Sequence, residues 1–297
     1  MLKDSDFVEA QREDIWWTYR NLDQQDAIAL SNILATNKKL RVLNLNGNKI
    51  GDQGLEAIID SLSGNNTIKQ LNFGSNDLTD KSIVKLATFL STNTSVISLC
   101  LFQNKISNDG ALALSNMLTK NKTLVYLYMY LNNIQNHGML MLSKSITAHP
   151  SLKTVWLDHN PITETCMTCV IQMMKQNKIL TALEITFNDN GTSTFYTPTT
   201  NFQKVVQDYL NVNVELEMKK SLSIRNVYLL CRILGAIELP LPVELKIHMV
   251  ALFCKGFEDS EIDLIYSILL DRNTIGKFDL ENMFNGDEFM RQCRLLK

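Results

Sequence analysis

Apolar residues recur along this chain at two spacings that alternate with each other. Between Leu40 and Leu180 a short pattern begins six times, and each start follows the previous one by 28 residues. In the first part of each unit, apolar residues alternate with other residues, as in a strand with one buried face. In the second part they recur four residues apart, as on one face of a helix. An internal repeat of this length is typical of a solenoid of strands and helices.

Two apolar columns predict the buried face of a parallel sheet. Each unit contributes two apolar residues that are separated by a single residue. Because alternate side chains of a strand point to opposite faces, both residues lie on the same side. The first column is Leu43, Leu71, Leu99, Leu127, Val155 and Leu183, and the second is Leu45, Phe73, Leu101, Met129, Leu157 and Ile185.

Asparagine recurs where each strand is expected to turn. An amide carries both donors and an acceptor for the backbone groups that a turn leaves unpaired. We therefore interpret this column as a structural ladder and not as a binding site. The residues are Asn48, Asn76, Asn104, Asn132, Asn160 and Asn188.

The second half of each unit predicts a helix that faces the sheet. Its apolar stripe begins at Leu30, Ile58, Leu86, Leu114, Leu142 and Val170 and continues four residues later at Leu34, Leu62, Leu90, Leu118, Ile146 and Met174. Asparagine favours the left-handed backbone conformation that ends many helices. We therefore expect left-handed caps at Asn37, Asn65, Asn93, Asn121, His149 and Asn177.

The units have the form LxxLxLxxNxL followed by a helical stretch, and this form resembles the leucine-rich repeat. With 28 residues and an outer helix, they are similar to the ribonuclease-inhibitor subtype. The resemblance implies an α/β solenoid with a parallel sheet on the concave side and helices on the convex side. We expect a capping repeat over residues 1–39, with Trp17 covering the core, then the solenoid over residues 40–200. An α-helical domain is expected over residues 201–297.

Composition limits the partners and the compartment. The chain has 297 residues, a hydrophobic content of 45% and a formal net charge of -2, which gives no electrostatic reason to bind a phosphate backbone. The N-terminal segment is acidic and lacks the apolar centre of a secretory signal, and no stretch of about 18 apolar residues occurs. We expect a soluble, monomeric, cytoplasmic protein that binds neither nucleic acid nor membrane.

No arrangement of reactive side chains predicts catalysis. Cys166 and Cys169 form a CxxC pair, but their repeat columns hold glycine, serine and alanine in other units, so we interpret them as small packing residues. Cys100 and His159 both reach the free face of the sheet, but two repeats separate them, on the order of 10 Å. A nucleophile and its base need a separation of about 3 Å. We expect no enzymatic activity and no cofactor.

Residues 271–282 resemble an EF-hand loop with Gly276 at its centre. However, Ile275 removes the ligand at the fifth position, and Asn282 replaces the bidentate glutamate at the twelfth. We therefore expect no bound metal.

The exposed half of the strand pattern is the part that packing does not explain. Its first two full repeats carry small and polar residues, whereas the third to fifth place five aromatic residues next to one another. Tyrosine and tryptophan dominate binding hot spots. In the alternative interpretation, the C-terminal region covers the cluster, or the rings only stack across strands. We predict a partner-binding surface made of Phe102, Tyr126, Tyr128, Tyr130, Trp156, Asp158, His159 and Glu184.

Motifs beyond the repeats offer a second hypothesis. One stretch resembles a SOCS box, which binds elongin C and selects a cullin, and part of it also resembles the opening of an F-box. Either resemblance implies a substrate adaptor of a cullin-type ubiquitin ligase, with docking residues in this stretch. A Leu-Pro pair that starts a helix explains the same residues equally well. The residues are Val227, Cys231, Leu239, Pro240, Leu241, Pro242 and Leu245.

The composition carries one further resemblance. The Asn-, Lys- and Ile-rich repeats and the acidic, methionine-bearing C-terminus are similar to the leucine-rich-repeat effectors that intracellular bacterial pathogens inject into host cells. This resemblance implies a host protein as the partner and the host cytosol as the location. The sequence therefore predicts a protein-interaction module and leaves the ligase adaptor as the alternative.

Overall fold

The computed structural model describes residues 4–188, 195–196 and 205–214. The chain divides into two compact units, residues 1–214 and 215–297, and all the described residues belong to the first unit. The part of the predicted C-terminal domain that follows residue 214 lies outside the described residues.

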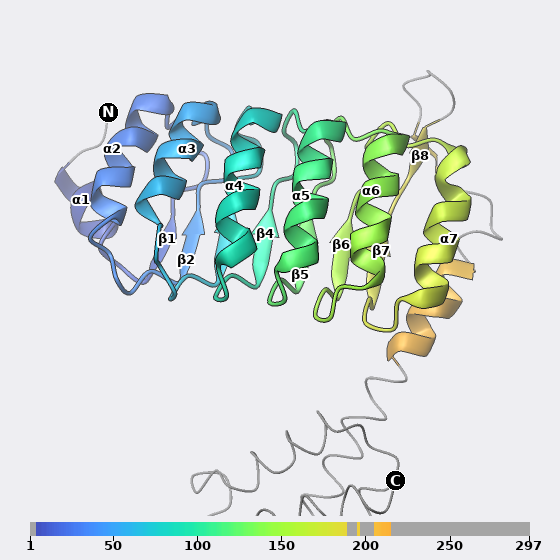
Figure 1. Cartoon of the computed structure of the whole chain (residues 1–297). Coiled ribbons are helices and arrows are strands. Elements are labelled where there is room, and N and C mark those ends of the chain that lie inside the picture. Colours follow the sequence, from blue (N-terminus) through green and yellow to red (C-terminus); the bar gives the residue numbers. More distant parts are fainter. Residues whose placement is uncertain (1–3, 189–194, 197–204, 215–297) are drawn as a thin grey trace, which may run out of the picture. The chain divides into compact units, whose positions relative to one another are not determined.

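Seven short strands form one parallel sheet, and their order in the sheet follows the chain. Neighbouring strands pair in the register that the repeat requires, with Leu43 opposite Leu71 and Leu71 opposite Leu99. Figure 1 shows the strands in one row behind the helices. The predicted parallel sheet is therefore confirmed. The strands are β1 (Asp14–Trp16), β2 (Val42–Asn44), β3 (Gln70–Asn72), β4 (Ser98–Cys100), β5 (Tyr126–Tyr128), β6 (Thr154–Trp156) and β7 (Ala182–Glu184).

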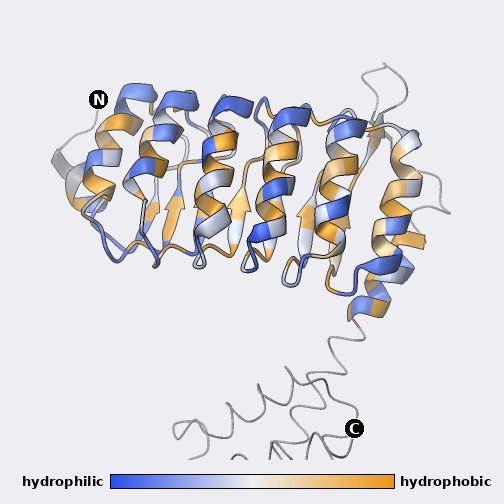
Figure 2. Cartoon of the chain, viewed as in Figure 1, coloured by the Kyte–Doolittle hydropathy of each residue, from blue (hydrophilic) through white to orange (hydrophobic). Residues whose placement is uncertain are grey.

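The helices that alternate with these strands lie side by side along one face of the sheet (Figure 1). Figure 2 shows apolar and polar residues alternating along each helix, as a helix with one buried side requires. The chain is therefore an α/β solenoid in its described part. The helices are α2 (Gln24–Leu34), α3 (Gly51–Ser61), α4 (Asp80–Thr92), α5 (Asn108–Lys120), α6 (Asn136–Thr147) and α7 (Met167–Gln176), with the 3-10 helix η1 (Glu164–Cys166) leading into α7.

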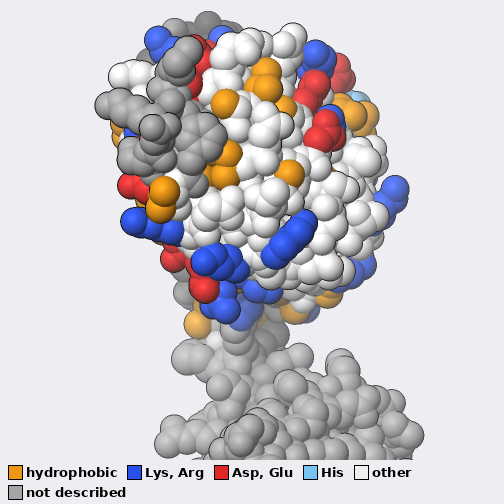
Figure 3. Space-filling view, turned by 90° about the vertical axis from the view of Figure 1, so that its left-hand side faces the viewer, with side chains coloured by type: hydrophobic (Ala, Val, Ile, Leu, Met, Phe, Trp, Pro, Cys, Tyr) orange, Lys and Arg blue, Asp and Glu red, His pale blue; other side chains and the backbone are white. Residues whose placement is uncertain are grey.

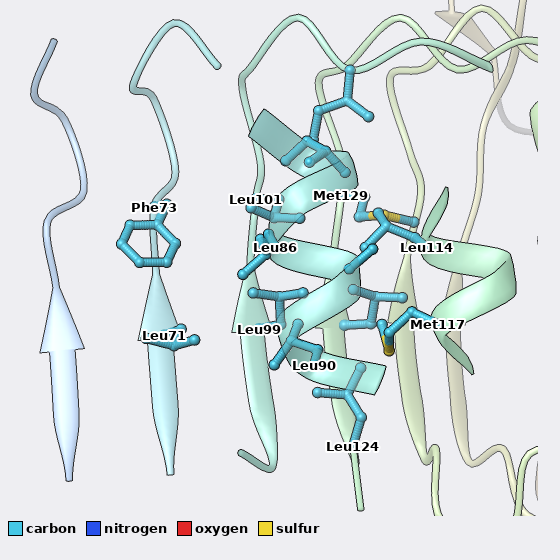
Figure 4. Close-up of a cluster of buried hydrophobic side chains, with 14 of the residues drawn as sticks. Leu71, Phe73, Leu86, Leu90, Leu99, Leu101, Leu114, Met117, Leu124 and Met129 are labelled. Atoms are coloured by element: carbon cyan, nitrogen blue, oxygen red, sulfur yellow. The ribbon is translucent and has the colours of Figure 1, made fainter. Parts of the chain in front are cut away.

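The predicted strand columns form the core between the sheet and the helices. Leu71 and Leu127 are 1% and 0% exposed, and the other members of the two columns are also buried. Figure 4 shows how strand residues such as Leu99 and helix residues such as Leu90 fill the space between the two layers. Full burial of one such side chain contributes about 1.5–3 kcal/mol, so the core columns are the main source of stability.

The first asparagine column forms the expected ladder between repeats. The Asn132 amide nitrogen donates to the carbonyls of Leu101 and Met129 at 2.9 and 3.0 Å, and its oxygen accepts the N–H of Ile106 at 3.1 Å. Leu101 and Ile106 belong to the preceding repeat, so each asparagine joins two units. Asn48, Asn76, Asn104 and Asn160 make equivalent bonds, and the side chain of Asn188 lies outside the described set.

The second asparagine column corrects one prediction. α4, α5 and α7 end at this column, whereas α2, α3 and α6 end two to four residues before it. No residue of the column is left-handed; Asn93, Asn121 and Asn177 have an extended backbone, with φ of -73°, -67° and -73°. The side chain makes the cap instead. The oxygen of Asn93 accepts the N–H groups two and three residues later, at 2.9 Å each, while its nitrogen donates to the Asn65 carbonyl at 2.9 Å. This extended conformation lets one amide close the turn and bind the preceding repeat.

His149 occupies one position of this column. Its Nδ1 accepts the N–H groups of Ser151 and Leu152 at 3.3 and 3.1 Å, which is the part played elsewhere by the amide oxygen. Burial, together with the positive charge of Lys122, lowers the pKa of His149 to about 4. The ring is therefore neutral near pH 7, as its accepting role requires.

The starts of α4 and α5 are each held by a carboxylate of the preceding helix. Asp52 of α3 accepts the N–H of Thr79 at 2.9 Å and the hydroxyl of Ser82 at 2.6 Å. Asp80 of α4 likewise accepts the N–H groups of Ser107 and Gly110. A carboxylate beside a helix N-terminus is favoured by the helix dipole, so these bonds stabilise successive helices in one orientation.

At the N-terminal end, β1 and α2 add one repeat, and α1 (Asp4–Glu9) precedes it. Trp17 is buried there, and its indole N–H donates to Glu9 at 2.9 Å. Arg20 pairs with the same carboxylate at 2.9 Å and lies over the Trp17 ring. Figure 3 looks onto this end and shows apolar side chains only in small, separate patches. Trp17 therefore covers the end of the core.

After β7 the spacing of the repeats changes. β8 (Phe187–Asn188) pairs antiparallel with β9 (Phe195–Tyr196). A helix over residues 205–214 then brings Asn213 into the second asparagine column, where its amide donates to the Asn177 carbonyl at 3.2 Å. The spacing between these two asparagines is 36 residues. The helix therefore packs against the last regular repeat as a longer, irregular unit.

Candidate partner-binding surface

The strand residues that alternate with the core columns form the free face of the sheet, and this face holds the predicted site. Phe102 follows β4, Tyr126 and Tyr128 lie in β5, Tyr130 follows β5, and Trp156 ends β6. The strands are in register, with Tyr128 opposite Trp156. The structure therefore brings all five aromatic residues, which we call the aromatic cluster, onto three adjacent strands.

Four rings of the aromatic cluster form a continuous series of contacts. Phe102 and Tyr130 stack with centroids 4.7 Å apart and planes at 1°. Tyr128 meets Trp156 edge to face at 4.9 Å, and Tyr130 lies 6.0 Å from Trp156. Such pairs contribute about 0.5–1.5 kcal/mol each beyond the area that they bury. Stacking across strands therefore occurs, and it holds the rings in place before any partner binds.

Stacking leaves part of the cluster open to solvent. Tyr126 and Trp156 are 38% and 37% exposed, and Phe102, Tyr128 and Tyr130 are half-buried. The rings bury one side against their neighbours and present the other. The cluster is therefore a preorganised aromatic surface that is partly open to solvent.

The aromatic surface extends toward the N-terminal repeats. The ring of Phe102 lies against Gly74, where a Cβ atom would overlap it, and the ring of Tyr19 lies against Gly47 in the same way. Each ring therefore covers a glycine, Gly74 or Gly47, in one of the first two full repeats. Asn44, on the free face between them, is only 8% exposed.

Sequence reasoning missed Tyr19 and Leu131, which are 71% and 43% exposed. Both belong to a column just past the free-face residues, and their φ angles are +53° and +57°. The column has positive φ in every repeat from Tyr19 to His159, yet Gly47 is its only glycine. Glycine content therefore gives no signal for this conformation, and only the constant repeat offset could have identified the column.

Three polar residues of the predicted site lie at one border of the aromatic cluster. Asp158 Oδ2 and His159 Nδ1 are 2.8 Å apart, and the backbone N–H of His159 donates to Thr186 at 2.7 Å. Glu184 is exposed on β7, directly opposite Trp156. The structure therefore places two carboxylates beside the exposed indole.

Burial favours the protonated forms of Cys100, Tyr128 and Tyr130 on this face. Burial raises the pKa of Cys100 to about 11. Burial also raises the pKa values of Tyr128 and Tyr130. Since the thiolate is the nucleophile, Cys100 is unreactive near neutral pH, and β5 separates its strand from the one that precedes His159. These residues do not form a nucleophile and base pair.

Within residues 4–188, 195–196 and 205–214, no group of three His, Cys, Asp or Glu side chains could hold a metal ion. Over the same residues, no helix is both long and apolar enough to cross a membrane. The EF-hand-like loop over residues 271–282 and the predicted ligase-docking residues between 227 and 245 lie outside the described part of the chain.

The repeat pattern matches the family model of the leucine-rich repeat over residues 36–58, 64–87 and 92–115. These segments span β2 to α5 of the solenoid. The chain therefore carries leucine-rich repeats, as the spacing of its apolar residues predicted. The ribonuclease-inhibitor subtype stays a prediction.

The chain is similar to several solved structures, and one of them has a TM-score above 0.5 and shows the same kind of fold. Actin-binding site 2 of leiomodin-1 is 18% identical, with a TM-score of 0.51, and the alignment covers 59% of this chain and 95% of that one. The tropomodulin C-terminal domain of Caenorhabditis elegans is 12% identical over 68% and 99% of the two chains, with a TM-score of 0.40. An internalin of Listeria monocytogenes is 18% identical over 53% and 52%, with a TM-score of 0.31. No curated protein matches the chain.

Proposed function

We propose that this chain is a non-catalytic module that binds another protein through the aromatic cluster. The observation that carries the proposal is the placement of five aromatic residues on three adjacent strands, on the face that the core does not use. Repeats with and without these residues have the same buried columns. Folding therefore does not require the rings, and binding accounts for them.

The size of the cluster suits a protein partner. Each aromatic side chain offers roughly 150–250 Å² of buriable area, so five half-exposed rings supply several hundred Å². An ordinary specific interface buries about 800 Å² on each partner. Because the rings already pack against one another, little side-chain entropy is lost on binding. The cluster is then the centre of an interface, and the polar residues around it form the rim.

The charges on the free face favour a partner with basic side chains. No lysine or arginine occupies the three free-face columns, from Asp14 to Thr186, whereas Asp158 and Glu184 flank Trp156. A cation over an indole ring gains about 0.5–2 kcal/mol, with the larger values in desolvated sites. An apolar segment that carries lysine or arginine next to its hydrophobic residues would satisfy both the rings and the carboxylates.

A solved structure of similar fold supports the class of function. The leiomodin-1 domain is described as an actin-binding site, and the likeness concerns the fold alone. We therefore suggest actin as a first protein to test for binding, and we do not propose it as the partner. Binding of actin that depends on Tyr128 and Trp156 would identify one partner directly.

The test compares two double variants of the full chain. Tyr128→Ala with Trp156→Ala removes the centre of the aromatic cluster, and Gln70→Ala with Asn72→Ala changes the same face on β3. Hot-spot residues contribute about 2 kcal/mol or more each, so the first variant should lose capture of its partner from eukaryotic lysate at least tenfold. The control should capture as the wild type does, with both read by quantitative mass spectrometry.

The stability of both variants separates binding from folding. We expect the aromatic variant to remain folded although less stable, because it loses ring stacking and partly buried area while the core columns stay intact. A folded aromatic variant with undiminished capture would refute the proposal. Equal losses in both double variants would also refute it, because the site would then not be specific to the aromatic cluster.

The effector hypothesis and the ligase-adaptor hypothesis predict that different proteins are captured from the lysate. If the chain is an effector of an intracellular bacterium, its partner is a host protein, its location is the host cytosol, and capture depends on the aromatic cluster. If it is a ligase adaptor, elongin C or another ligase core protein is captured even by the aromatic variant. Recovery of that protein should then be lost in Leu241→Ala with Leu245→Ala, since these residues carry the docking motif.

A further inference from the structure

Cys166 and Cys169 lie one helical turn apart at the start of α7. Cys166 is the last residue of η1 and is buried, and Cys169 is half-buried. Residues three apart in a helix have Cα atoms about 5 Å apart, which is within the range of roughly 4.4–6.8 Å found in disulfides. Packing explains Cys166, which takes the place of Gly110 and Gly138 in its column. Cys169 also packs against the core, but part of its side chain reaches the surface, and packing alone does not account for that part.

Cys169 opens onto a groove of about 340 Å³ between α6 and α7, which lie side by side in Figure 1. Leu140 and Met173 line the groove together with polar residues such as Ser143, and among its lining residues Lys144 is the only charged one. A thiol at the wall of a groove whose single charge is positive suits a small anionic reagent. The groove lies on the helix side of the solenoid, away from the aromatic cluster.

The two sulfurs have different electrostatic surroundings. The neighbouring Cys166 thiol and the backbone N–H groups at the start of α7 lower the pKa of Cys169 to about 7, against the opposing effect of burial. The proximity of Cys169 and burial raise the pKa of Cys166. The Cys166 thiol donates to the Asn136 carbonyl at 3.5 Å.

We propose that Cys166 and Cys169 form a reversible thiol–disulfide pair, in which Cys169 reacts with a small anionic disulfide that enters the groove and Cys166 resolves the product. The two sulfurs have different surroundings, and this difference assigns the two roles. Cys169, which reaches the groove, is the attacking thiolate, and the buried Cys166 keeps its proton until the second step.

The reaction balances in two exchanges. The Cys169 thiolate attacks one sulfur of the small disulfide, so that the S–S bond breaks, a mixed disulfide forms on Cys169, and the first small thiolate leaves and takes a proton from solvent. Cys166 then loses its proton to solvent and attacks the Cys169 sulfur, which releases the second small thiolate. Two cysteine thiols are oxidised, and one small disulfide is reduced to two thiols.

The experiment uses the full chain and oxidised glutathione as the probe. The peptide that holds both cysteines should lose two hydrogens by mass spectrometry, and dithiothreitol should restore it. Cys166→Ser should instead accumulate a glutathione adduct on Cys169, because no resolving thiol is present. Cys169→Ser should leave Cys166 unmodified under the same conditions.

Cys100 provides an internal control on the opposite face. Because the pKa of Cys100 is raised and that of Cys169 is lowered, iodoacetamide at pH 7 should label Cys169 about tenfold faster or more. This factor allows for the weaker nucleophilicity of a thiolate with a low pKa. Circular dichroism before the reaction shows that each variant is folded. Equal labelling rates for the two cysteines would overturn the proposal. So would a glutathione adduct that persists in the wild type, because Cys166 would then not resolve it.

Discussion

The repeats built on β2 and β3, which we call the polar group, and those built on β4 to β6, which we call the aromatic group, have the same buried face and different free faces. In the first group the free face carries residues such as Asn72 and Gly74, and in the second it carries Phe102, Tyr128 and Trp156. Register and core are continuous across the boundary between them. The buried columns therefore follow from the fold, whereas the free-face columns vary independently of it, and this independence is the basis on which we propose a binding role for the aromatic cluster.

The largest expected effect should be equal in the two groups. Leu71→Ala in the polar group and Leu127→Ala in the aromatic group each remove a buried leucine of the same column. Each should lower the free energy of unfolding by about 2–5 kcal/mol, because a cavity is added to the lost transfer energy. Urea unfolding followed by circular dichroism measures both. A loss below about 1 kcal/mol in one group alone would contradict the shared core.

His149 makes a pH response specific to the aromatic group, since Asn65 and Asn93 occupy the same column in the polar group. Its folded-state pKa of about 4 lies below the usual value of 6.5. The neutral ring therefore stabilises the fold fully above pH 6.5, and this contribution is lost as the pH falls toward 4. The loss amounts to about 3 kcal/mol at 1.36 kcal/mol per pKa unit.

His149→Asn should remove this part of the pH response, because an amide accepts the same two N–H groups without titrating. The measurement is urea unfolding of the wild type and the variant at pH 7.5 and pH 4.5. The wild type should lose about 2.5 kcal/mol more between these two conditions than the variant does, because the full loss is reached only below pH 4. Equal losses in both proteins would show that His149 does not titrate with folding.

A smaller effect should appear where the two groups meet. Gly74→Ala adds a methyl group that would overlap the Phe102 ring, and it should therefore disturb the stack of Phe102 with Tyr130. Overpacking costs about 1–3 kcal/mol, and the loss of glycine flexibility in the unfolded chain offsets about 0.4–1 kcal/mol. We expect a net destabilisation of about 1 kcal/mol, with Asn46→Ala in the same column as the control. A stabilised Gly74→Ala protein would show that the ring moves freely.

The core and the location of the aromatic cluster could be predicted because each depends on strict periodicity. A residue such as Leu127 or Asn132 has the same neighbours in every unit, so its spacing alone determines its environment. Tyr128 could be assigned to the free face for the same reason. Contacts inside the cluster, such as the stack of Phe102 on Tyr130, depend on rotamers that spacing does not determine.

Two features could not be predicted from local preferences. Asn93 and its equivalents were expected to be left-handed because asparagine favours that conformation, but the bonds they make to the preceding repeat require an extended backbone. The column of Tyr19 and Leu131 is left-handed although neither residue is glycine. In both cases the tertiary contacts of the solenoid outweigh the intrinsic preference of the residue.

The most direct test of the central claim is site-specific photo-crosslinking in eukaryotic lysate. The photoreactive residue p-benzoylphenylalanine replaces Tyr126 in one protein and Gln70 in another, because these residues share one column and differ only in the group of repeats to which they belong. The account predicts a discrete crosslinked protein from position 126 and none from position 70. A crosslink of equal yield at position 70, or none at position 126, would contradict it.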